Sequence, residues 1–151
     1  MITVRQATSA VVGQIFRFAR DLYEATKLER YGDFGEQWVA ELSHFLIVNE
    51  QNALVLLAED GEDPLGAAIV TLCPYPFGPS SYANEWLFWV EPKARKSGVA
   101  SALLAAVEAW AKSKGARHVM LSEMAGEAGM ESFCNALGFE KFQTMFAREV
   151  L

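Results

Sequence analysis

Residues 90–104, Val-Glu-Pro-Lys-Ala-Arg-Lys-Ser-Gly-Val-Ala-Ser-Ala-Leu-Leu, restrict the fold of this chain more than any other segment. An aromatic, apolar run before it predicts a strand, Gly98 predicts a turn, and the apolar spacing after it predicts a helix. The first amides of a helix have no partner within the helix, and the helix dipole places about half a positive charge there. Gly98 lets a ligand approach the backbone closely, and Arg95 and Lys96 add positive charge just upstream. The segment therefore predicts a turn that binds an anion such as phosphate.

Composition excludes several classes of protein. With 151 residues, 52% of them hydrophobic, residues 1–151 are expected to form a single globular domain. No apolar run reaches the roughly 20 residues of a membrane span, and the polar start is not a signal peptide. We therefore expect a cytoplasmic protein with no membrane partner. The net charge of −6 argues against nucleic-acid binding and favours a cationic substrate.

Cysteine and histidine are too sparse to predict a metal centre or a disulfide framework. Cys73 and Cys134 lie far apart in the sequence, so both are expected to remain reduced. His44 and His118 have no metal-ligand spacing. The sequence therefore predicts no metal site.

The remaining pattern predicts an α/β fold of the α+β type, with one mixed sheet of six to seven strands and about four helices on both faces. Strands are expected at 2–6, 53–58, 65–72, 82–90, 117–122 and 141–149, and helices at 10–25, 36–48, 98–114 and 127–137. The strand, helix and strand order after residue 82 favours a parallel pair. In the second helix, Trp38, Leu42, Phe45 and Leu46 are expected to face inward. The terminal strand could pair with a second chain at a sheet edge, which would give a homodimer.

The order of these elements resembles that of the GNAT superfamily of acyl-CoA N-acyltransferases. Residues 90–100 carry Val-x-Pro-x-x-Arg-x-x-Gly-x-Ala, which matches the pyrophosphate motif of that family, and Gly138-Phe139 follows about 40 residues later. The resemblance covers essentially the whole chain. It implies an N-acetyltransferase whose cosubstrate is acetyl-CoA.

The resemblance also implies which residues bind coenzyme A. Main-chain groups of Phe88, Trp89 and Val90 would pair with the pantetheine arm, and an amide near Trp89 or Val90 would polarise the thioester carbonyl. The residues expected around the pyrophosphate are Arg95, Lys96, Ser97, Gly98, Val99, Ala100 and Ser101.

The general base is expected to be a carboxylate, because the family transfers acetyl by direct attack of an amine. A primary amine such as lysine has a pKa of about 10.4, so a base is needed to produce its nucleophilic form at neutral pH. Glu85 at the start of the fourth strand is the first candidate and Glu123, just after the fifth, is the second. Asn84 faces the opposite side of the strand from Glu85, so only one of the two can face a substrate. The alternative for both glutamates is a solvated strand end.

Two positions depart from the family pattern. Relatives commonly place a tyrosine, which can protonate the leaving thiolate, where this chain has Cys134; a small packing cysteine is the alternative role here. Many relatives carry an asparagine that contacts the pantetheine arm where this chain has Glu127. Asn135 is a possible substitute, and an exposed helix residue is its alternative.

Acidic residues in the first third of the chain suit a cationic amine. They are Asp21, Glu24, Glu29, Asp33 and Glu36, and the aromatic residues Tyr75, Phe77 and Tyr82 could form the opposite wall of an acceptor pocket. A solvated acidic face and a packed proline-rich connection are the alternatives. The prediction is an acetyltransferase acting on a primary amine of a small molecule or a protein. The alternative is a non-catalytic acyl-CoA-binding or protein-interaction module on the same fold.

Overall fold

The computed structural model describes residues 1–124 and 129–150. The helices are α1 (Val12–Ala25), α2 (Glu36–Val48), α3 (Val99–Ser113) and α4 (Met130–Ala136), with 3-10 turns η1 (Ser9–Val11), η2 (Leu28–Arg30) and η3 (Pro92–Ala94). The strands are β1 (Ile2–Gln6), β2 (Ala53–Asp60), β3 (Asp63–Pro74), β4 (Ser81–Val90) and β5 (His118–Met120). No helix in these described ranges combines the length and apolar character of a membrane span.

The strands form one mixed sheet in the order β1-β2-β3-β4-β5. The first four strands are antiparallel neighbours, and β5 lies parallel to β4. The second and third strands form an antiparallel hairpin, and the predicted parallel pair that the helix α3 connects is confirmed.

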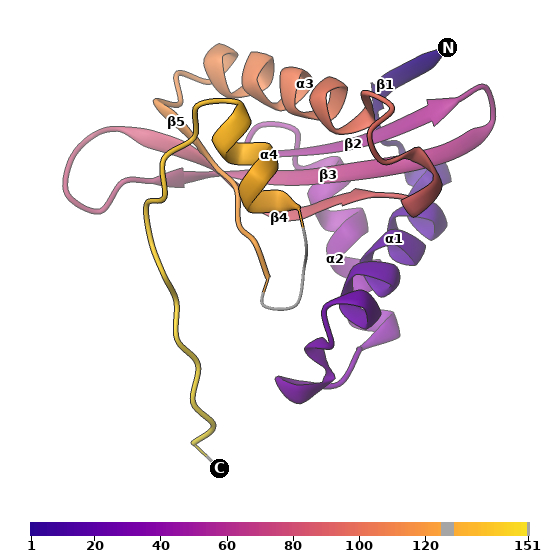
Figure 1. Ribbon diagram of the computed structural model, residues 1–151, viewed down its shortest axis with the longest axis horizontal. Coiled ribbons are helices and arrows are strands. Elements are labelled where there is room, and N and C mark those ends of the chain that lie inside the picture. Colours follow the sequence, from indigo (N-terminus) through magenta and orange to yellow (C-terminus); the bar gives the residue numbers. More distant parts are fainter. Residues whose placement is uncertain (125–128, 151) are drawn as a thin grey trace.

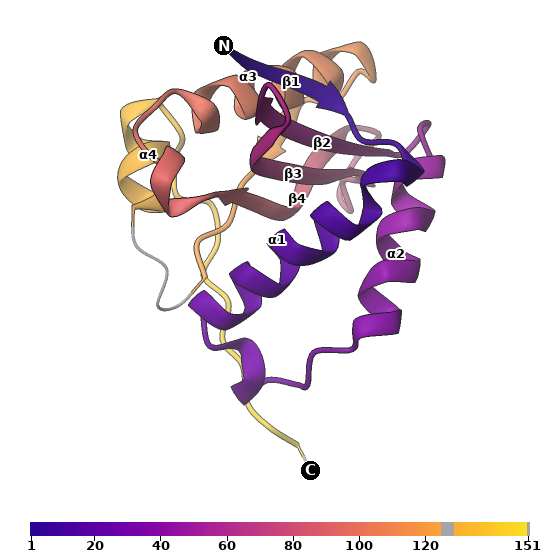
Figure 2. The same ribbon diagram turned by 90° about the vertical axis from the view of Figure 1, so that its right-hand side faces the viewer.

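The sheet is covered on both faces, with α3 and α4 on one side and α1 and α2 on the other (Figures 1 and 2). The apolar run of β2 explains this arrangement, because alternate side chains enter two separate cores. Leu54 and Leu56 pack beneath α3, whereas Val55 and Leu57 pack beneath α1 and α2. The prediction of a mixed sheet between two helical layers is therefore confirmed.

The prediction that α2 turns Trp38 and Phe45 inward was wrong. These side chains are 71% and 58% exposed, while Leu46 is buried and Leu42 is half-buried. The helix is apolar around most of its circumference, so the spacing of apolar residues could not identify the side that meets the sheet.

The prediction of six to seven strands, including a last strand at 141–149, was also wrong. The sheet has five strands, and residues 141–150 form an extended, exposed segment that leaves the domain (Figure 1). The alternation of side chains in this segment suits a strand, but a strand forms only where its backbone N–H and C=O groups find a neighbouring strand. The segment has no such neighbour among the described residues of the chain.

Gly66 is required where β3 approaches the end of β4. A Cβ atom at this position would lie 2.5 Å from the carbonyl oxygen of Trp89, which is backbone and cannot move aside. We expect Gly66→Ala to lower the free energy of unfolding by about 1–3 kcal/mol, as overpacking does elsewhere. Thermal and urea unfolding measure this loss. Gly13→Ala is the matched control, because a Cβ at Gly13 meets nothing within 4 Å; equal losses in both variants would contradict the close approach.

Candidate functional site

The parallel strands β4 and β5 separate part of the way along their length. Their pairing joins Tyr82, Ala83 and Asn84 to His118, Val119 and Met120 and then ends, although β4 continues to Val90. From residue 85 to residue 90, the edge of β4 that faces away from β3 has no strand partner among the described residues. Such an edge presents free main-chain groups to an extended ligand.

A β-bulge marks the point of separation. Leu87 pairs with Ile69 and Glu85 pairs with Val70, so Trp86 is the extra residue in β4. The indole nitrogen of Trp86 donates a hydrogen bond to the hydroxyl of Thr71 at 2.8 Å. A bulge bends its strand and increases the local twist, which accounts for the divergence of β4 from β5 at this position.

The direction of each backbone group on the open edge follows from one hydrogen bond. The amide of Glu91 donates to the carbonyl of Leu65 at 2.8 Å, so it points toward β3. Because successive backbone groups alternate between the two sides of a strand, Trp89 also directs its amide toward β3. Phe88 and Val90 therefore direct their amides toward the open edge.

The open edge leads directly to the amino end of α3. The first amide that donates into this helix is that of Ala102, which reaches the carbonyl of Gly98 at 3.0 Å. Within the part of the chain that the structure describes, no amide from residue 96 to residue 101 donates to a backbone carbonyl. Lys96 and Gly98 have positive φ angles of 64° and 93°, which turn the chain into the helix. We call residues 95–101 the cradle; its unpaired amides and the helix dipole favour an anion.

Arg95 is exposed, yet two contacts hold it against the end of β4. Its Nε donates to the carbonyl of Val90 at 3.1 Å, and its guanidinium lies 5.0 Å from the ring centroid of Trp89. The hydroxyl of Ser97 donates to the carbonyl of Ala94. These contacts hold the loop against the end of β4 while leaving positive charge beside the amides.

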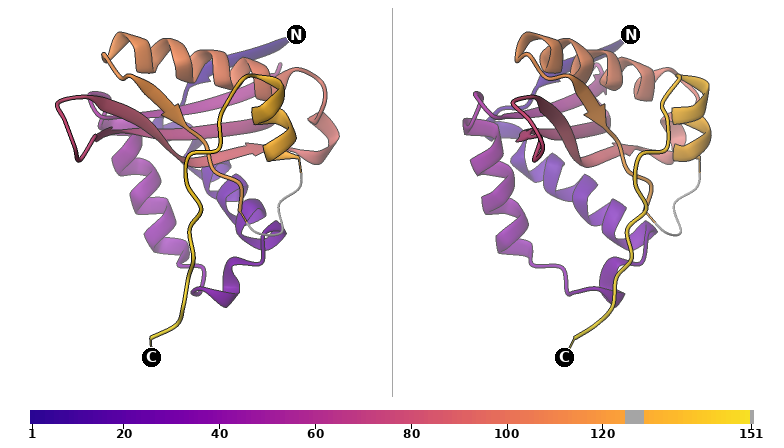
Figure 3. Two further views of the ribbon diagram at one scale, coloured as in Figure 1. Left: turned by 60° about the vertical axis from the view of Figure 1, so that its left-hand side comes forward. Right: turned by 90° about the vertical axis from the view of Figure 1, so that its left-hand side faces the viewer.

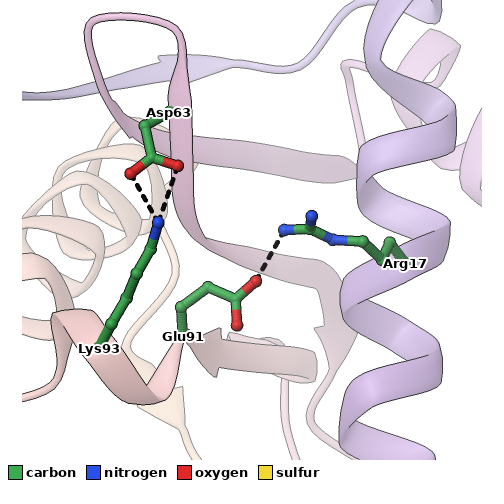
Figure 4. Close-up of polar contacts among 4 residues, drawn as sticks. All are labelled: Arg17, Asp63, Glu91 and Lys93. Carbon is green, nitrogen blue, oxygen red and sulfur yellow. Dashed lines mark hydrogen bonds and ion pairs between the residues drawn. The ribbon is translucent and has the colours of Figure 1, made fainter.

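Two ion pairs connect the loop just before the cradle, at Glu91 and Lys93, to other elements (Figure 4). Glu91 accepts from Arg17 of α1 at 2.7 Å, and Lys93 donates to both carboxylate oxygens of Asp63 in the β2–β3 hairpin, at 2.7 and 2.9 Å. Each exposed pair contributes at most about 1 kcal/mol to stability. Their effect is to fix the loop to both α1 and the hairpin.

The two candidate bases, Glu85 and Glu123, have different hydrogen-bond partners in the structure. Glu85 is half-buried at the point where β4 and β5 diverge, and its carboxylate accepts from the amide and hydroxyl of Ser122 at 3.2 and 2.6 Å. Glu123 instead accepts from the amide of Glu131 at 3.0 Å, which caps the amino end of α4. Glu85 therefore lies beside the open edge, whereas Glu123 stabilises a helix terminus.

The remaining predicted residues lie around α4 or outside the described part of the chain. Cys134 is half-buried within α4, and Asn135 is exposed on the same helix. Glu127 lies outside the described residues. Phe133 of α4 packs near Phe88, with ring centroids 6.2 Å apart, so α4 covers the apolar side of β4 close to its open edge.

The two histidines take no part in this site. His44 lies within 3.4 Å of the hydroxyl of Ser9 on the far side of α2, and His118 is exposed on β5. Over residues 1–124 and 129–150, no three His, Cys, Asp or Glu side chains form a group that could hold a metal ion.

The acidic loop between α1 and α2 is ordered by aromatic packing. Phe34 packs against Phe16 and Tyr23, and the hydroxyl of Tyr23 donates to the carbonyl of Gly32 at 2.7 Å. Desolvation raises the pKa of Tyr23, and the negative charges of Glu29 and Asp33 raise it further. The loop carries the carboxylates of Glu29 and Asp33 together with the cations of Lys27 and Arg30. Glu36 forms an ion pair with Arg20, so this carboxylate is neutralised.

The aromatic loop between β3 and β4 does not lie opposite the acidic loop. It projects from the end of the sheet remote from η3, as Figures 1 and 3 show. Tyr75 and Phe77 pack edge to face there, with ring centroids 5.7 Å apart. The structure therefore does not bring these residues and the acidic loop together.

Sequence reasoning missed three parts of the site: the bulge at Trp86, the contact between Glu85 and Ser122, and the ion pair between Arg17 and Glu91. The apolar run at 86–90 is typical of a strand buried on both faces and gives no signal for the bulge. The two polar contacts join residues 37 and 74 positions apart, and no local pattern identifies such pairs.

Comparison with known proteins identifies the family. The sequence model of the acetyltransferase (GNAT) family matches residues 19–139. No curated protein sequence matches the chain. The fold is similar to that of a predicted acetyltransferase from Clostridium acetobutylicum solved with acetyl-CoA, with a TM-score of 0.82, 14% identity, and coverage of 99% of this chain and 96% of that one.

Two further solved structures share the fold. AAC(6')-Iy in complex with the bisubstrate analogue CoA-S-monomethyl-acetylneamine has a TM-score of 0.78 and 18% identity, covering 100% of this chain and 99% of that one. An aminoglycoside acetyltransferase from an uncultured soil metagenomic sample, in complex with sisomicin, has a TM-score of 0.75 and 12% identity, with coverage of 99% and 96%. These low identities show the fold, and the family match over residues 19–139 shows the family. The chain belongs to the GNAT family of acetyltransferases.

Proposed function

We propose that this protein transfers acetyl from acetyl-CoA to a primary amine of a cationic small molecule or of a protein, by direct attack in a ternary complex. The proposal rests on one observation: the open edge of β4 runs directly into the cradle, whose amides are unpaired. An extended arm ending in a diphosphate matches both parts, since the edge offers strand-like pairing and the cradle binds an anion.

The residues of the cradle fit the pyrophosphate of coenzyme A. Unpaired amides from Lys96 to Ser101 supply donors, and a Cβ at Gly98 would meet nothing within 4 Å, so the approach to the backbone is open. Acetyl-CoA supplies the acetyl group as a thioester; an amine would attack its carbonyl carbon, and coenzyme A would leave as the thiolate when the C–S bond breaks. The outward amides of Phe88 and Val90 would hold the pantetheine arm, and either is placed to donate to a developing oxyanion.

Glu85 is the proposed general base. Its carboxylate lies where β4 and β5 begin to separate, and Ser122 fixes its orientation through two hydrogen bonds. A carboxylate at this point would take a proton from the ammonium group of the acceptor, directly or through one water molecule, and so produce the amine that attacks. Glu123 would act only by holding α4 in place.

The acidic loop supports a cationic acceptor. The carboxylates of Glu29 and Asp33, which contribute to the raised pKa of Tyr23, would attract the ammonium group of an amine substrate. Two of the similar structures were solved with an aminoglycoside or an acetylneamine conjugate. Polycationic amines are therefore the first acceptors to test.

The function is tested by following thiol release from acetyl-CoA with polyamines, aminoglycosides and lysine peptides as acceptors. Amine-dependent release is the expected result. The replacement of the usual tyrosine by Cys134 favours one other function on the same fold, a module that binds acyl-CoA without catalysis. Binding of acetyl-CoA without release in the presence of every acceptor would contradict the transferase and support that module.

Arg95 should contribute to cofactor affinity because its contacts with Val90 and Trp89 hold the cradle in place. We expect Arg95→Gln to raise the Kd for coenzyme A about tenfold, because the variant loses both the stack on Trp89 and the hydrogen bond to Val90. Arg95→Lys should recover little of this loss, since lysine cannot stack and donate in the same geometry. Isothermal titration calorimetry measures both values. Full recovery by lysine would show that only the charge matters.

A further inference from the structure

Trp86 is exposed beside the proposed base, in a strand whose following residues are all buried. Its side chain is 51% exposed, whereas Leu87–Val90 are buried. Trp86 is the extra residue of the β-bulge, and it lies between Glu85 and the rest of the open edge of β4. Aromatic side chains are typical of the surfaces that line small-molecule sites. The position of Trp86 therefore suits a contact with the acceptor.

One hydrogen bond fixes the ring of Trp86 on the face of the sheet that α1 and α2 cover. Its Nε1 donates to the hydroxyl of Thr71 at 2.8 Å. Thr71 pairs with Ala53, whose side chain belongs to the core beneath α1 and α2, and directly paired residues point to the same face. The ring is therefore held by its nitrogen-bearing edge, and its accessible surface has a set orientation on the side of α1 and α2 (Figure 2).

The ring of Trp86 has no positively charged partner within the described part of the chain. Two other tryptophans do have one, since the Arg95 guanidinium lies 5.0 Å from the ring centroid of Trp89 and Lys114 Nζ lies 6.0 Å from that of Trp110. The face of an aromatic ring attracts a cation within about 6 Å, and tryptophan does so most strongly. The accessible surface of Trp86 is therefore available to a cation from outside the chain.

Glu85 and Trp86 point away from each other, although they are neighbours in the chain. Glu85 accepts hydrogen bonds from Ser122, beyond β5, whereas Trp86 donates to Thr71 of β3. Adjacent Cα atoms are about 3.8 Å apart, so a molecule that contacts both side chains must span several carbon atoms. An amine that reacts beside Glu85 must lose its proton, whereas a second amine with a pKa of about 10.4 keeps its charge at neutral pH.

We propose that the acceptor is a diamine or polyamine whose second ammonium group lies against the indole ring of Trp86 while its first amine reacts beside Glu85. Thr71 is then a positioning residue, because it holds the ring in place through the indole hydrogen bond. This assignment depends on the acetyl transfer proposed above and narrows its acceptor class. A monoamine, or a lysine side chain with no second cation nearby, would be a poorer acceptor.

Two acceptors that differ only in the second charge test the role of Trp86. Putrescine and pentylamine have the same length, and a methyl group takes the place of the second ammonium group in pentylamine. The kcat/KM of the wild type should favour putrescine by at least about fivefold, as one cation–π contact allows. Trp86→Leu should remove most of this preference and change kcat/KM for pentylamine little, because leucine keeps an apolar contact but has no π face.

Two further variants separate the ring from its support. Thr71→Val keeps the ring but removes the acceptor of its hydrogen bond, so it should lose part of the preference for putrescine. Trp38→Leu is the matched control and should keep the preference. Trp38 is 71% exposed, but it lies in the first turn of α2, at the end of that helix remote from the sheet (Figure 2). Thermal unfolding should show that all three variants remain folded.

Binding of the acceptor is measured separately from catalysis by nuclear magnetic resonance of isotope-labelled protein. Putrescine should shift the indole N–H resonance of Trp86, identified by its loss in Trp86→Leu, more than pentylamine does. A protein that shows this shift but releases no thiol would contradict the acetyl transfer and support the contact with Trp86. An unchanged Trp86 resonance, equal preferences in the wild type and Trp86→Leu, or a preference lost in Trp38→Leu instead would overturn the role of Trp86.

Discussion

Gly98→Glu should raise the Kd for acetyl-CoA at least a hundredfold, which corresponds to about 2.7 kcal/mol. A carboxylate at this position would lie among the unpaired amides of the cradle and would repel the pyrophosphate at short distance. No atom lies within 4 Å of the added Cβ, so the side chain clashes with nothing, and its cost to the fold is limited to the backbone strain of a positive φ. Calorimetric titration with coenzyme A measures the loss, and thermal unfolding checks the fold.

The control for this variant separates charge from backbone strain. Gly98 has a φ angle of 93°, so any side chain there strains the turn. Gly98→Asn introduces a similar strain without charge, and asparagine tolerates positive φ better than most residues. We expect Gly98→Asn to retain most of the affinity. Equal losses in both variants would attribute the effect to strain, and normal binding by Gly98→Glu would show that the cradle does not hold the cofactor.

Glu85→Gln should lower kcat/KM for the amine by about two to three orders of magnitude at neutral pH, the usual contribution of a general base. Affinity for acetyl-CoA should not change, since Glu85 lies at the apex of the strand separation and outside the cradle. The defect should diminish as the pH approaches the amine pKa of about 10.4, because the acceptor then loses its proton without help. A pH series of initial rates for both proteins measures this convergence.

Glu123→Gln is the matched control for the base. Its carboxylate caps α4 by accepting from the amide of Glu131, so the variant should lose a little stability and retain its rate. If Glu123→Gln instead showed the pH-dependent defect and Glu85→Gln did not, the assignment of the two carboxylates would be reversed. A defect in Glu85→Gln that stayed constant with pH would indicate a positioning role.

The helices and the first four strands were predictable because their signals are local. The continuous apolar run at 53–58 is typical of a strand buried on both faces, and Val99, Leu103 and Val107 recur at the spacing of one helix face, which is the buried side of α3. The cradle was predictable for the same reason, since a strand, a glycine turn and a helix follow one another within 15 residues.

Errors arose where the outcome depends on distant partners. The alternating pattern of residues 141–149 suits a strand, but a strand forms only where it can pair with the edge of a sheet. No local sequence pattern indicates whether such an edge is available. The same limit applies to α2, whose apolar residues extend around the helix, and to Glu85, whose orientation depends on Ser122. The sequence also could not show that the amides of Phe88 and Val90 face the open edge while that of Trp89 faces β3. The hydrogen bond from the amide of Glu91 to the carbonyl of Leu65 fixes these directions.

Amide hydrogen exchange with and without acetyl-CoA tests most directly whether the cofactor occupies the open edge and the cradle. Bound acetyl-CoA should slow exchange at the amides of Phe88, Val90 and residues 96–101. The amide of Trp89 is an internal control, because it already faces β3 and should change little. Protection confined to other parts of the chain, or equal protection of Trp89 and its two neighbours, would contradict the site.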